Sequence, residues 1–154
     1  MKRNLNKQLI DAAIHYDFAA MKRLLAGGAD FNALDPDEGD TIFTEAISHG
    51  ASRDCIIDMI RLGANPNVPR AVGATPLILA VWALDLPLLQ MLLDAGADLN
   101  TPGFIEEGGM TPLDAVCDGY HTTETKPEHM VLDALELLLK SKGAKCYYEL
   151  AANA

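Results

Sequence analysis

A pattern of residues that recurs about every 34 positions constrains this chain more than any other feature. Three copies open with a threonine that is followed by apolar residues and an alanine, and the copies end with Gly-Ala followed by a polar residue. The opening residues are Thr41, Thr75 and Thr111, and the closing glycines are Gly28, Gly63 and Gly96. A chain made of such short copies must stack them, because one copy cannot bury its own apolar face.

The copy from Thr75 to Asn100 contains the signals for two short helices. Thr75 can cap the first helix, and Pro76 suits the first helical position, where a missing N–H costs nothing. Leucines at helical spacing predict a second helix over 87–95. Gly96 can end that helix, because the residue just past a helix often adopts a positive φ. Helices shorter than about 12–15 residues are marginal alone, so each pair needs a neighbour.

A period near 33, a Thr-Pro-Leu-x-x-Ala opening and a Gly-Ala-Asp-x-Asn exit resemble the ankyrin repeat family. The resemblance covers roughly residues 5 to 145. It implies an all-α solenoid of about four stacked helix–turn–helix repeats, with capping repeats at both ends. We expect a single domain over 1–154, with repeats at about 5–32, 33–67, 68–100 and 101–145. The tail at 146–154 is either a half helix or frayed.

The chain departs from the family pattern at several positions. The residues that stand where the family has histidine are Thr44, Ile78 and Asp114. Leu84 occupies an inter-helix position where the family usually has glycine. The first repeat lacks the Thr-Pro signature and carries charged residues on one face, as an amino-terminal cap does. Asn4 or Asn6 is expected to cap its first helix.

The fourth repeat is longer than the third by 11 residues. The additional segment, DGYHTTETKPEH at 118–129, is polar. We expect it to form a solvated loop between helices at 112–117 and 130–140. Leu132, Leu135, Leu138 and Leu139 should share the apolar face of the second of these helices.

Charge and composition disfavour several classes of function. The chain has 12 basic and 22 acidic residues, a net charge of −10, which opposes binding to nucleic acid or to anionic membranes. Apolar runs fall short of the roughly 18 residues of a membrane span, and residues 1–6 precede no secretory signal. The three scattered cysteines suit a reduced, cytoplasmic setting, and we expect a monomer. The acidity either serves solubility or favours a protein partner with a basic surface.

Motifs of catalysis and cofactor binding are missing from the sequence. It contains no Gly-rich phosphate loop, no nucleophile elbow and no Cys-x-x-Cys, so we expect neither an enzyme nor a cofactor. His121 and His129 lie near Glu124 and Glu128 in the polar segment. Zinc sites usually need tighter spacing and more thiolate or imidazole ligands, so no metal site is predicted.

The ankyrin resemblance implies that partners bind a concave face, formed by the protruding turns and the outer positions of the first helices. The residues expected there are His15, Asp37, Glu38, Asp40, Ser48, His49, Val72, Trp82, Phe104, Ile105, Glu106, Glu107, Met110 and Asp118. Trp82 is the only tryptophan, and tryptophan is a favoured interface anchor. The alternative is that Trp82 folds under the adjacent turn as core. Phe104 and Ile105 likewise either contact a partner or pack the long turn.

The sequence leaves three kinds of binding function open. One is an adaptor or scaffold that brings proteins together. Another is a small acidic inhibitor, of the immunity type, that occludes a basic enzyme. The third is a bacterial ankyrin protein delivered into a host cell, although no secretion signal supports it.

Overall fold

The computed structural model describes residues 2–34, 40–67 and 73–152, except for the side chains of Lys2, Arg3 and Glu106. Three of the expected partner-binding residues, Asp37, Glu38 and Val72, lie outside the described residues. The chain divides into two compact units, Met1–Val68 and Pro69–Ala154, which we call unit 1 and unit 2. The division falls close to the expected junction between the second and third repeats.

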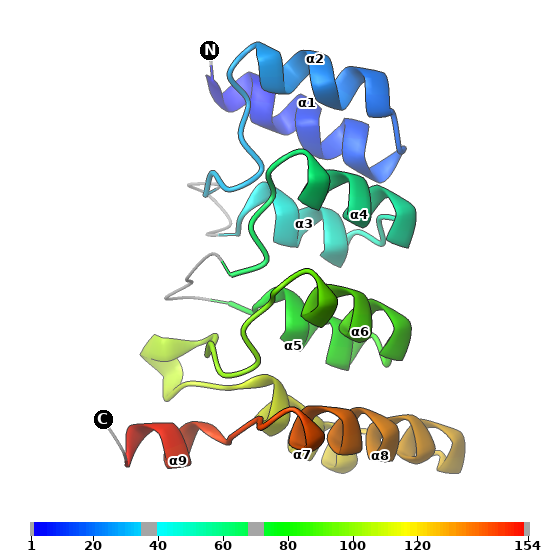
Figure 1. Cartoon of the computed structure of the whole chain (residues 1–154), viewed down its shortest axis with the longest axis vertical. Coiled ribbons are helices and arrows are strands. Elements are labelled where there is room, and N and C mark those ends of the chain that lie inside the picture. The colour runs from blue at the N-terminus through cyan, green and yellow to red at the C-terminus, as the bar shows by residue number, and fades with distance from the viewer. Residues whose placement is uncertain (1, 35–39, 68–72, 153–154) are drawn as a thin grey trace. The chain divides into compact units, whose positions relative to one another are not determined.

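The described part of unit 1 consists of two helix pairs (Figure 1). They are α1 (Lys2–Ile14), α2 (Phe18–Ala26), α3 (Ile42–Ser48) and α4 (Arg53–Arg61). Helix α1 packs against α2 and α3, and α3 packs against α4. The largest fully buried side chains of this unit come from all four helices and from the segment after α2: Leu9, Met21, Phe31, Ile42, Phe43, Ile56 and Met59. The pairs therefore share one apolar core.

Helix α1 corrects one expectation about capping. Because it begins at Lys2, Asn4 and Asn6 lie inside the helix and neither is its cap. Asn6 instead accepts a hydrogen bond from the backbone N–H of Asp30 at 3.1 Å. This bond ties the first repeat's closing segment back to its own first helix.

Unit 2 also consists of two helix pairs, with additional short helices in its described part. They are α5 (Pro76–Trp82), α6 (Leu86–Asp94), η1 (Ile105–Glu107), α7 (Pro112–Thr122), α8 (Lys126–Ser141) and α9 (Tyr147–Ala151). Helix α5 packs against α6 and α7, and α8 packs against α6 and α7. Leu77, Ile78, Leu89, Leu92 and Leu132 are fully buried between them. The tail forms a half helix, α9, which answers the question left open by the sequence.

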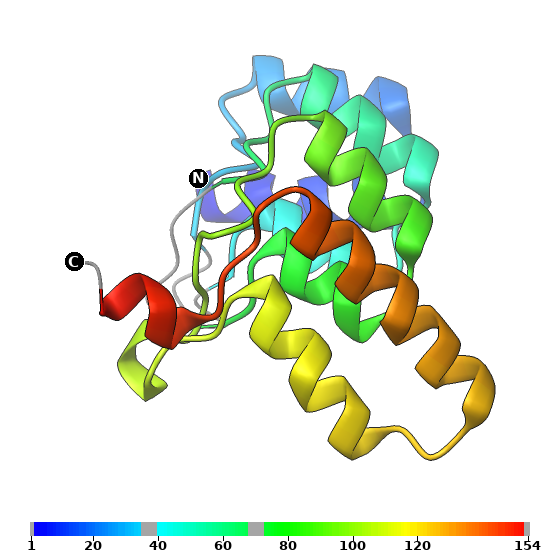
Figure 2. The same ribbon diagram turned by 60° about the horizontal axis from the view of Figure 1, so that its bottom comes forward.

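The expectation of a solvated loop at 118–129 is wrong. These residues lengthen both helices of the fourth pair, and only a short connection joins α7 to α8 (Figure 2). Thr125 starts α8 early: it donates to Glu128 Oε2 at 2.6 Å, and its Oγ1 accepts from the Glu128 N–H at 3.4 Å. Such a reciprocal capping box satisfies amides that a helix start leaves free, so the polar segment can be helical.

The residues at the family's histidine position have different roles in the three openings. Thr44 and Asp114 complete capping boxes with Thr41 and Thr111. Ile78 has no side-chain acceptor, and Thr75 only accepts from the Ile78 N–H at 3.4 Å. Two of the three substitutions therefore keep a polar side chain that stabilises the helix start.

The asparagine of the exit signature joins neighbouring repeats within each unit. In unit 1, Asn32 donates from Nδ2 to the Gly63 carbonyl at 2.9 Å and accepts from the Asn65 N–H at 2.7 Å. In unit 2, Asn100 Oδ1 accepts from the Lys145 N–H at 2.9 Å. Both residues are oriented by the preceding acidic residue, which accepts their backbone N–H at 2.9 Å. The recurring asparagine is thus a connection between repeats.

Candidate binding surface

Trp82 is the last residue of α5, and 46% of its surface is exposed. The alternative that it is buried core is therefore wrong. Its ring lies 5.7 Å from the ring of Phe104 between centroids, at an interplanar angle of 44°. Phe104 is half-buried, whereas the next residue, Ile105, is 47% exposed. Trp82, Phe104 and Ile105 thus form an aromatic and aliphatic surface, which we call the Trp82 patch.

The segment 103–110 holds Phe104 and Ile105 in place. Gly103 and Met110 pair as an antiparallel bridge, with N–H to carbonyl distances of 2.8 and 2.9 Å. The Phe104 N–H donates to the Gly73 carbonyl at 3.1 Å. Phe104 has a φ of 52°, which costs a residue other than glycine roughly 1–2 kcal/mol. This strained conformation directs the chain from the bridge into η1 and places Phe104 beside Trp82.

Helix α9 supports the same segment. A side chain at Gly109 would lie 2.3 Å from the ring of Tyr147, so only glycine fits beneath this ring. The Tyr147 N–H donates to Asp114 Oδ2 at 2.8 Å, and Thr111 Oγ1 lies 2.9 Å from the Lys145 carbonyl oxygen. Helix α9 therefore fixes the base of the long turn, and the Trp82 patch is a preorganised surface.

The other expected partner-binding residues have different exposures. In unit 2, Glu107 and Asp118 are exposed and Met110 is half-buried in the bridge. In unit 1, His15, Ser48 and His49 are exposed and Asp40 is half-buried. Within unit 2 the structure thus brings Trp82 and Phe104 together, and Ile105 follows Phe104 in the chain.

His15 and His49 are fixed in the same way at the ends of α1 and α3. His15 Nδ1 lies 2.9 Å from the Asp11 carbonyl, and His49 Nδ1 lies 2.8 Å from the Glu45 carbonyl. A carbonyl oxygen only accepts, so Nδ1 carries the proton in each ring. Nδ1 of each ring is thus engaged within its own helix, and Nε2 is the other ring nitrogen.

Tyr16, which is adjacent to His15, was not among the residues expected to contact a partner. Tyr16 has a φ of 53° at the turn between α1 and α2, and its hydroxyl donates to Asp58 Oδ2 at 2.7 Å. The hydrogen bond that Tyr16 donates to Asp58 raises the pKa of Tyr16 from its ordinary value of 10.0 to about 12. The same bond, followed by one from Arg61, lowers the pKa of Asp58. The pair therefore joins the first and second repeats with a pH-dependent interaction.

We expect the stabilising effect of the Tyr16 hydroxyl to vanish at both extremes of pH. The ionised Asp58 is favoured in the folded chain, so its contribution is complete above its ordinary pKa of 3.8 and is lost as the pH falls through the lowered pKa. The protonated Tyr16 is also favoured, so its contribution is complete below pH 10.0 and is lost as the pH rises towards 12. Urea unfolding of the chain and of Tyr16→Phe should differ most near neutral pH. A difference that is constant from acid to alkaline pH would contradict this.

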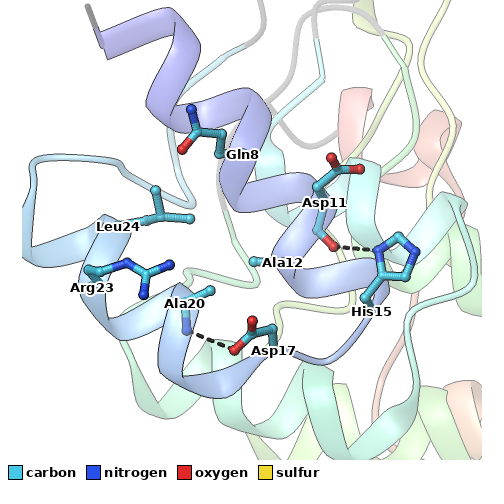
Figure 3. Close-up of a pocket in the computed structure, with 8 residues that line it drawn as sticks. All are labelled: Gln8, Asp11, Ala12, His15, Asp17, Ala20, Arg23 and Leu24. Atoms are coloured by element: carbon cyan, nitrogen blue, oxygen red, sulfur yellow. Dashed lines mark hydrogen bonds between the residues drawn. The ribbon is translucent and has the colours of Figure 1, made fainter.

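A polar hollow of about 320 Å³ lies between α1 and α2 (Figure 3). Its lining residues include Asp11, His15, Asp17 and Arg23. Asp17 accepts from the Ala20 N–H at 2.9 Å and so caps α2. The carboxylate of Asp17 and the backbone carbonyl of Asp11 are thus already engaged in local hydrogen bonds.

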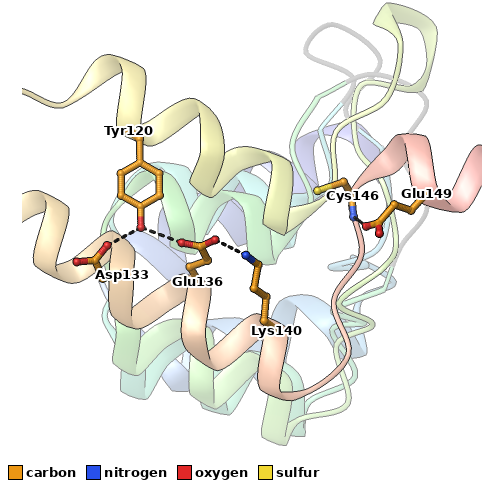
Figure 4. Close-up of polar contacts among 6 residues, drawn as sticks. All are labelled: Tyr120, Asp133, Glu136, Lys140, Cys146 and Glu149. Atoms are coloured by element: carbon orange, nitrogen blue, oxygen red, sulfur yellow. Dashed lines mark hydrogen bonds and ion pairs between the residues drawn. The ribbon is translucent and has the colours of Figure 1, made fainter.

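A polar cluster joins α7 to α8 where both are longer than the helices of the third repeat (Figure 4). The Tyr120 hydroxyl lies 2.7 Å from Asp133 Oδ1 and 3.0 Å from Glu136 Oε2. Burial and these two carboxylates raise the pKa of Tyr120 well above its usual range. Lys140 pairs with Glu136 and lowers the pKa of that carboxyl. The cluster stabilises the extended helix pair.

Cys55 and Cys146 show little nucleophilic character. Burial raises the pKa of Cys55 to about 11, and its thiol donates to the Ala13 carbonyl at 3.1 Å. Burial and the hydrogen bond to Asp114 raise the pKa of Cys146 to about 11. Both thiols are therefore protonated at neutral pH, whereas the thiolate is the nucleophile. Among the described residues, no group of three His, Cys, Asp or Glu side chains is placed to hold a metal ion.

The negative charge is concentrated in unit 2. Residues 69–154 contain 5 basic and 12 acidic residues, a net charge of −7, whereas residues 1–68 contain 7 and 10, a net charge of −3. The Trp82 patch belongs to the more acidic unit. In addition, none of the helices in the described ranges is long and apolar enough to cross a membrane.

Comparison with known families identifies the repeat. The family described as ankyrin repeats (3 copies) matches residues 9–103, which is more than half of the chain. The chain belongs to the ankyrin repeat family. The expected class, an all-α ankyrin-repeat solenoid, is confirmed by this match together with the helix pairs. Ankyrin repeats are generally protein–protein interaction modules and typically not enzymes. The match ends at Gly103, before the lengthened fourth helix pair. No curated protein matches the chain.

Proposed function

We propose that this ankyrin-repeat protein binds a protein partner with a basic surface through the Trp82 patch. The observation that supports this most is the exposed tryptophan, whose ring is tilted against that of Phe104 on a turn fixed by backbone hydrogen bonds. A rigid aromatic side chain gives up little conformational freedom on binding and is favoured at interface centres. Trp82, Phe104 and Ile105 carry no acid, base or nucleophile, and we infer that the patch binds its partner without catalysing a reaction.

Charge supports the chemistry of the partner. Glu107 and Asp118 are exposed in the same unit as Trp82, and this unit has a net charge of −7. Carboxylates near an apolar centre accelerate the approach of a basic partner and reject acidic ones. The free thiols of Cys55, Cys117 and Cys146 suit the cytoplasmic setting that we propose for this interaction.

An adaptor or scaffold is the use that we favour. Helix α9 and the extended α7–α8 pair enlarge unit 2 beyond two minimal repeats, and larger surfaces suit proteins that hold more than one partner. An inhibitor of a basic enzyme is the second candidate, and the charge of unit 2 supports it equally. The two differ in outcome, because only the inhibitor abolishes the activity of the captured partner at a stoichiometry of one to one.

Replacing Trp82 with alanine should weaken partner binding by about 2 kcal/mol, or roughly 30-fold. The measurement is calorimetric titration of the partner captured from the native lysate, at low and high salt. Tyr148→Ala is the matched control, because Tyr148 is 71% exposed on α9 and outside the Trp82 patch. The melting temperatures of both variants should stay near that of the unchanged chain. Equal affinities of the two variants would disprove the role of Trp82.

A further inference from the structure

The second helices of the two pairs in unit 2 leave an open, apolar groove between them. The groove has a volume of about 640 Å³ and is lined by Leu86, Pro87, Gln90, Ala134, Leu137, Leu138 and Ser141. The first three belong to α6 and the others to α8, and five of the seven are apolar. We call it the α6–α8 groove. It is separate from the Trp82 patch, whose residues come from α5 and from the segment 103–110.

Helix α8 has two apolar faces, and only one is used by the core. Leu132, Leu135 and Leu139 are buried. A second stripe, spaced by four, three and four residues, contains Met130, Ala134, Leu137 and Ser141, and such spacing places side chains on one helix face. Its large members are strongly exposed, Met130 at 72% and Leu137 at 73%.

The groove stays open because two of the four α8 side chains that line it, Ala134 and Ser141, are short. Ala134 and Ser141 on α8 and Pro87 on α6 are small lining residues, which leave space between the two helices. Leu138 was expected to share the buried face of Leu132, but it is only half-buried and lines the groove instead. An isolated exposed leucine is unremarkable. A continuous apolar stripe that borders a groove indicates a contact surface.

We propose that the α6–α8 groove binds an amphipathic helix of a partner protein, with aliphatic side chains on one face and basic residues along its edges. A groove that runs between two helices suits the helix-in-groove mode, in which anchors at i, i+3, i+4 and i+7 enter the groove. Asp85 and Asp94 lie at the two ends of α6. They give the α6 side carboxylates at both ends, within a unit of net charge −7.

A second copy of this chain does not fit the groove. A stable dimer buries about 800 Å² on each partner, and two large exposed side chains, Met130 and Leu137, supply a small part of that area. Pairing two copies would also bring together two surfaces of the same sign, each from a unit of net charge −7, and this repulsion costs free energy. A basic helix meets neither obstacle.

The groove gives the protein a second docking surface in addition to the Trp82 patch. The evidence for the groove is independent of the evidence for the patch, since the groove lies on α6 and α8 and the patch lies on α5 and the long turn. An adaptor needs two surfaces, so the two together account for that function. A mutation that disables one surface leaves the other intact, so binding at each surface can be tested separately.

The test uses a designed peptide as the probe. It is a fluorescein-labelled peptide of about 18 residues, or five helical turns, made of leucine at i, i+3, i+4 and i+7 spacing and lysine elsewhere. A scrambled peptide of the same composition controls for charge alone. Fluorescence anisotropy at physiological ionic strength should show binding of the amphipathic peptide about tenfold or more tighter than that of the scrambled one.

Two variants of the groove should weaken binding of the amphipathic peptide about tenfold. Leu137→Gln removes an exposed wall, and Ala134→Lys fills the groove and repels the lysines of the peptide. Tyr148→Gln is the matched control, because Tyr148 is 71% exposed, close to the 73% of Leu137, and lies outside the groove. Trp82→Ala should also bind the peptide normally, which separates this proposal from the Trp82 patch. Thermal melting verifies that each variant is folded.

Three results would overturn the proposal. One is equal affinity of the chain for the scrambled and the amphipathic peptide, which would show that charge alone accounts for the binding. Another is unchanged affinity in both folded groove variants. The third is a dimer of the free chain, detected by sedimentation and abolished by Leu137→Gln, which would assign the groove to a second copy.

Discussion

Replacing Gly103 with alanine is expected to destabilise unit 2 by about 2–3 kcal/mol. A β-carbon at this position would lie 2.5 Å from the Gly73 carbonyl oxygen and 3.2 Å from Ile78 Cδ1. The closest atom belongs to the backbone, so the contact can be relieved only by moving the turn. Such a movement breaks the Phe104 N–H bond to Gly73 and separates Phe104 from Trp82. Urea unfolding, followed by near-ultraviolet circular dichroism of Trp82, measures both effects.

Gly108→Ala is the matched control in the same turn. Gly108 has a φ of 109°, and no atom lies within 4 Å of the position that its β-carbon would take. Alanine there incurs backbone strain alone, about 1 kcal/mol. The Trp82 signal of the folded protein should therefore be retained in Gly108→Ala and changed in Gly103→Ala. A larger destabilisation in Gly108→Ala would contradict the close approach of Gly103 and Gly73.

Replacing Asp114 with alanine should also cost about 2–3 kcal/mol, because one carboxylate oxygen serves three donors. Asp114 Oδ2 accepts from the Thr111 N–H at 2.9 Å, the Thr111 hydroxyl at 2.8 Å and the Tyr147 N–H at 2.8 Å. Its loss removes the capping box of α7 and releases α9. Hydrogen exchange should show faster exchange of the α9 amides in this variant than in the unchanged chain.

Asp118→Ala tests whether these effects are specific to Asp114. Asp118 lies one turn further along α7 and is exposed, so its replacement should change the free energy of unfolding by less than about 0.5 kcal/mol. Equal destabilisation in the two variants, or protected α9 amides in Asp114→Ala, would show that the bond to Tyr147 does not hold α9.

The helix pairs were predictable from the sequence because their start and stop signals recur. Thr75, Pro76 and Gly96 act locally, through a cap, a fixed φ and a positive φ. Helix α5 begins directly after Thr75, and α6 forms within one residue of the expected 87–95. Local chemistry of this kind does not depend on distant contacts. The same signals also explain why the family could be recognised from residues alone.

The wrong expectation of a loop at 118–129 arose from the polar composition of this segment, although the segment also contains a local signal for a helix start. Thr125-Lys126-Pro127-Glu128 is a capping-box sequence with a proline in the first helical turn. Its polarity suggested a loop. In the structure, Tyr120 and Asp133 pair across the two helices, and His129 Nε2 lies 3.1 Å from the Thr123 carbonyl. Polar residues can therefore join helices, provided that partners lie opposite them.

The Trp82 patch and the α6–α8 groove were only partly predictable. The repeat register predicted that Trp82 is exposed. The contact between the Phe104 and Trp82 rings depends on a positive φ and on a backbone hydrogen bond with Gly73, and neither is encoded in a short motif. The groove results from which of two apolar stripes on α8 faces the core. That choice depends on the packing of α7 and α6 and not on α8 alone.

The most direct measurement of the central claim is site-specific photo-crosslinking at Ile105. A photoreactive phenylalanine at this exposed position should yield one discrete adduct with the partner in cells that make the protein, and addition of Trp82→Ala should abolish the adduct. The same group at Lys142, which is exposed after α8, should leave that partner unlabelled. Labelling of the partner from Lys142 but not from Ile105 would contradict binding through the Trp82 patch.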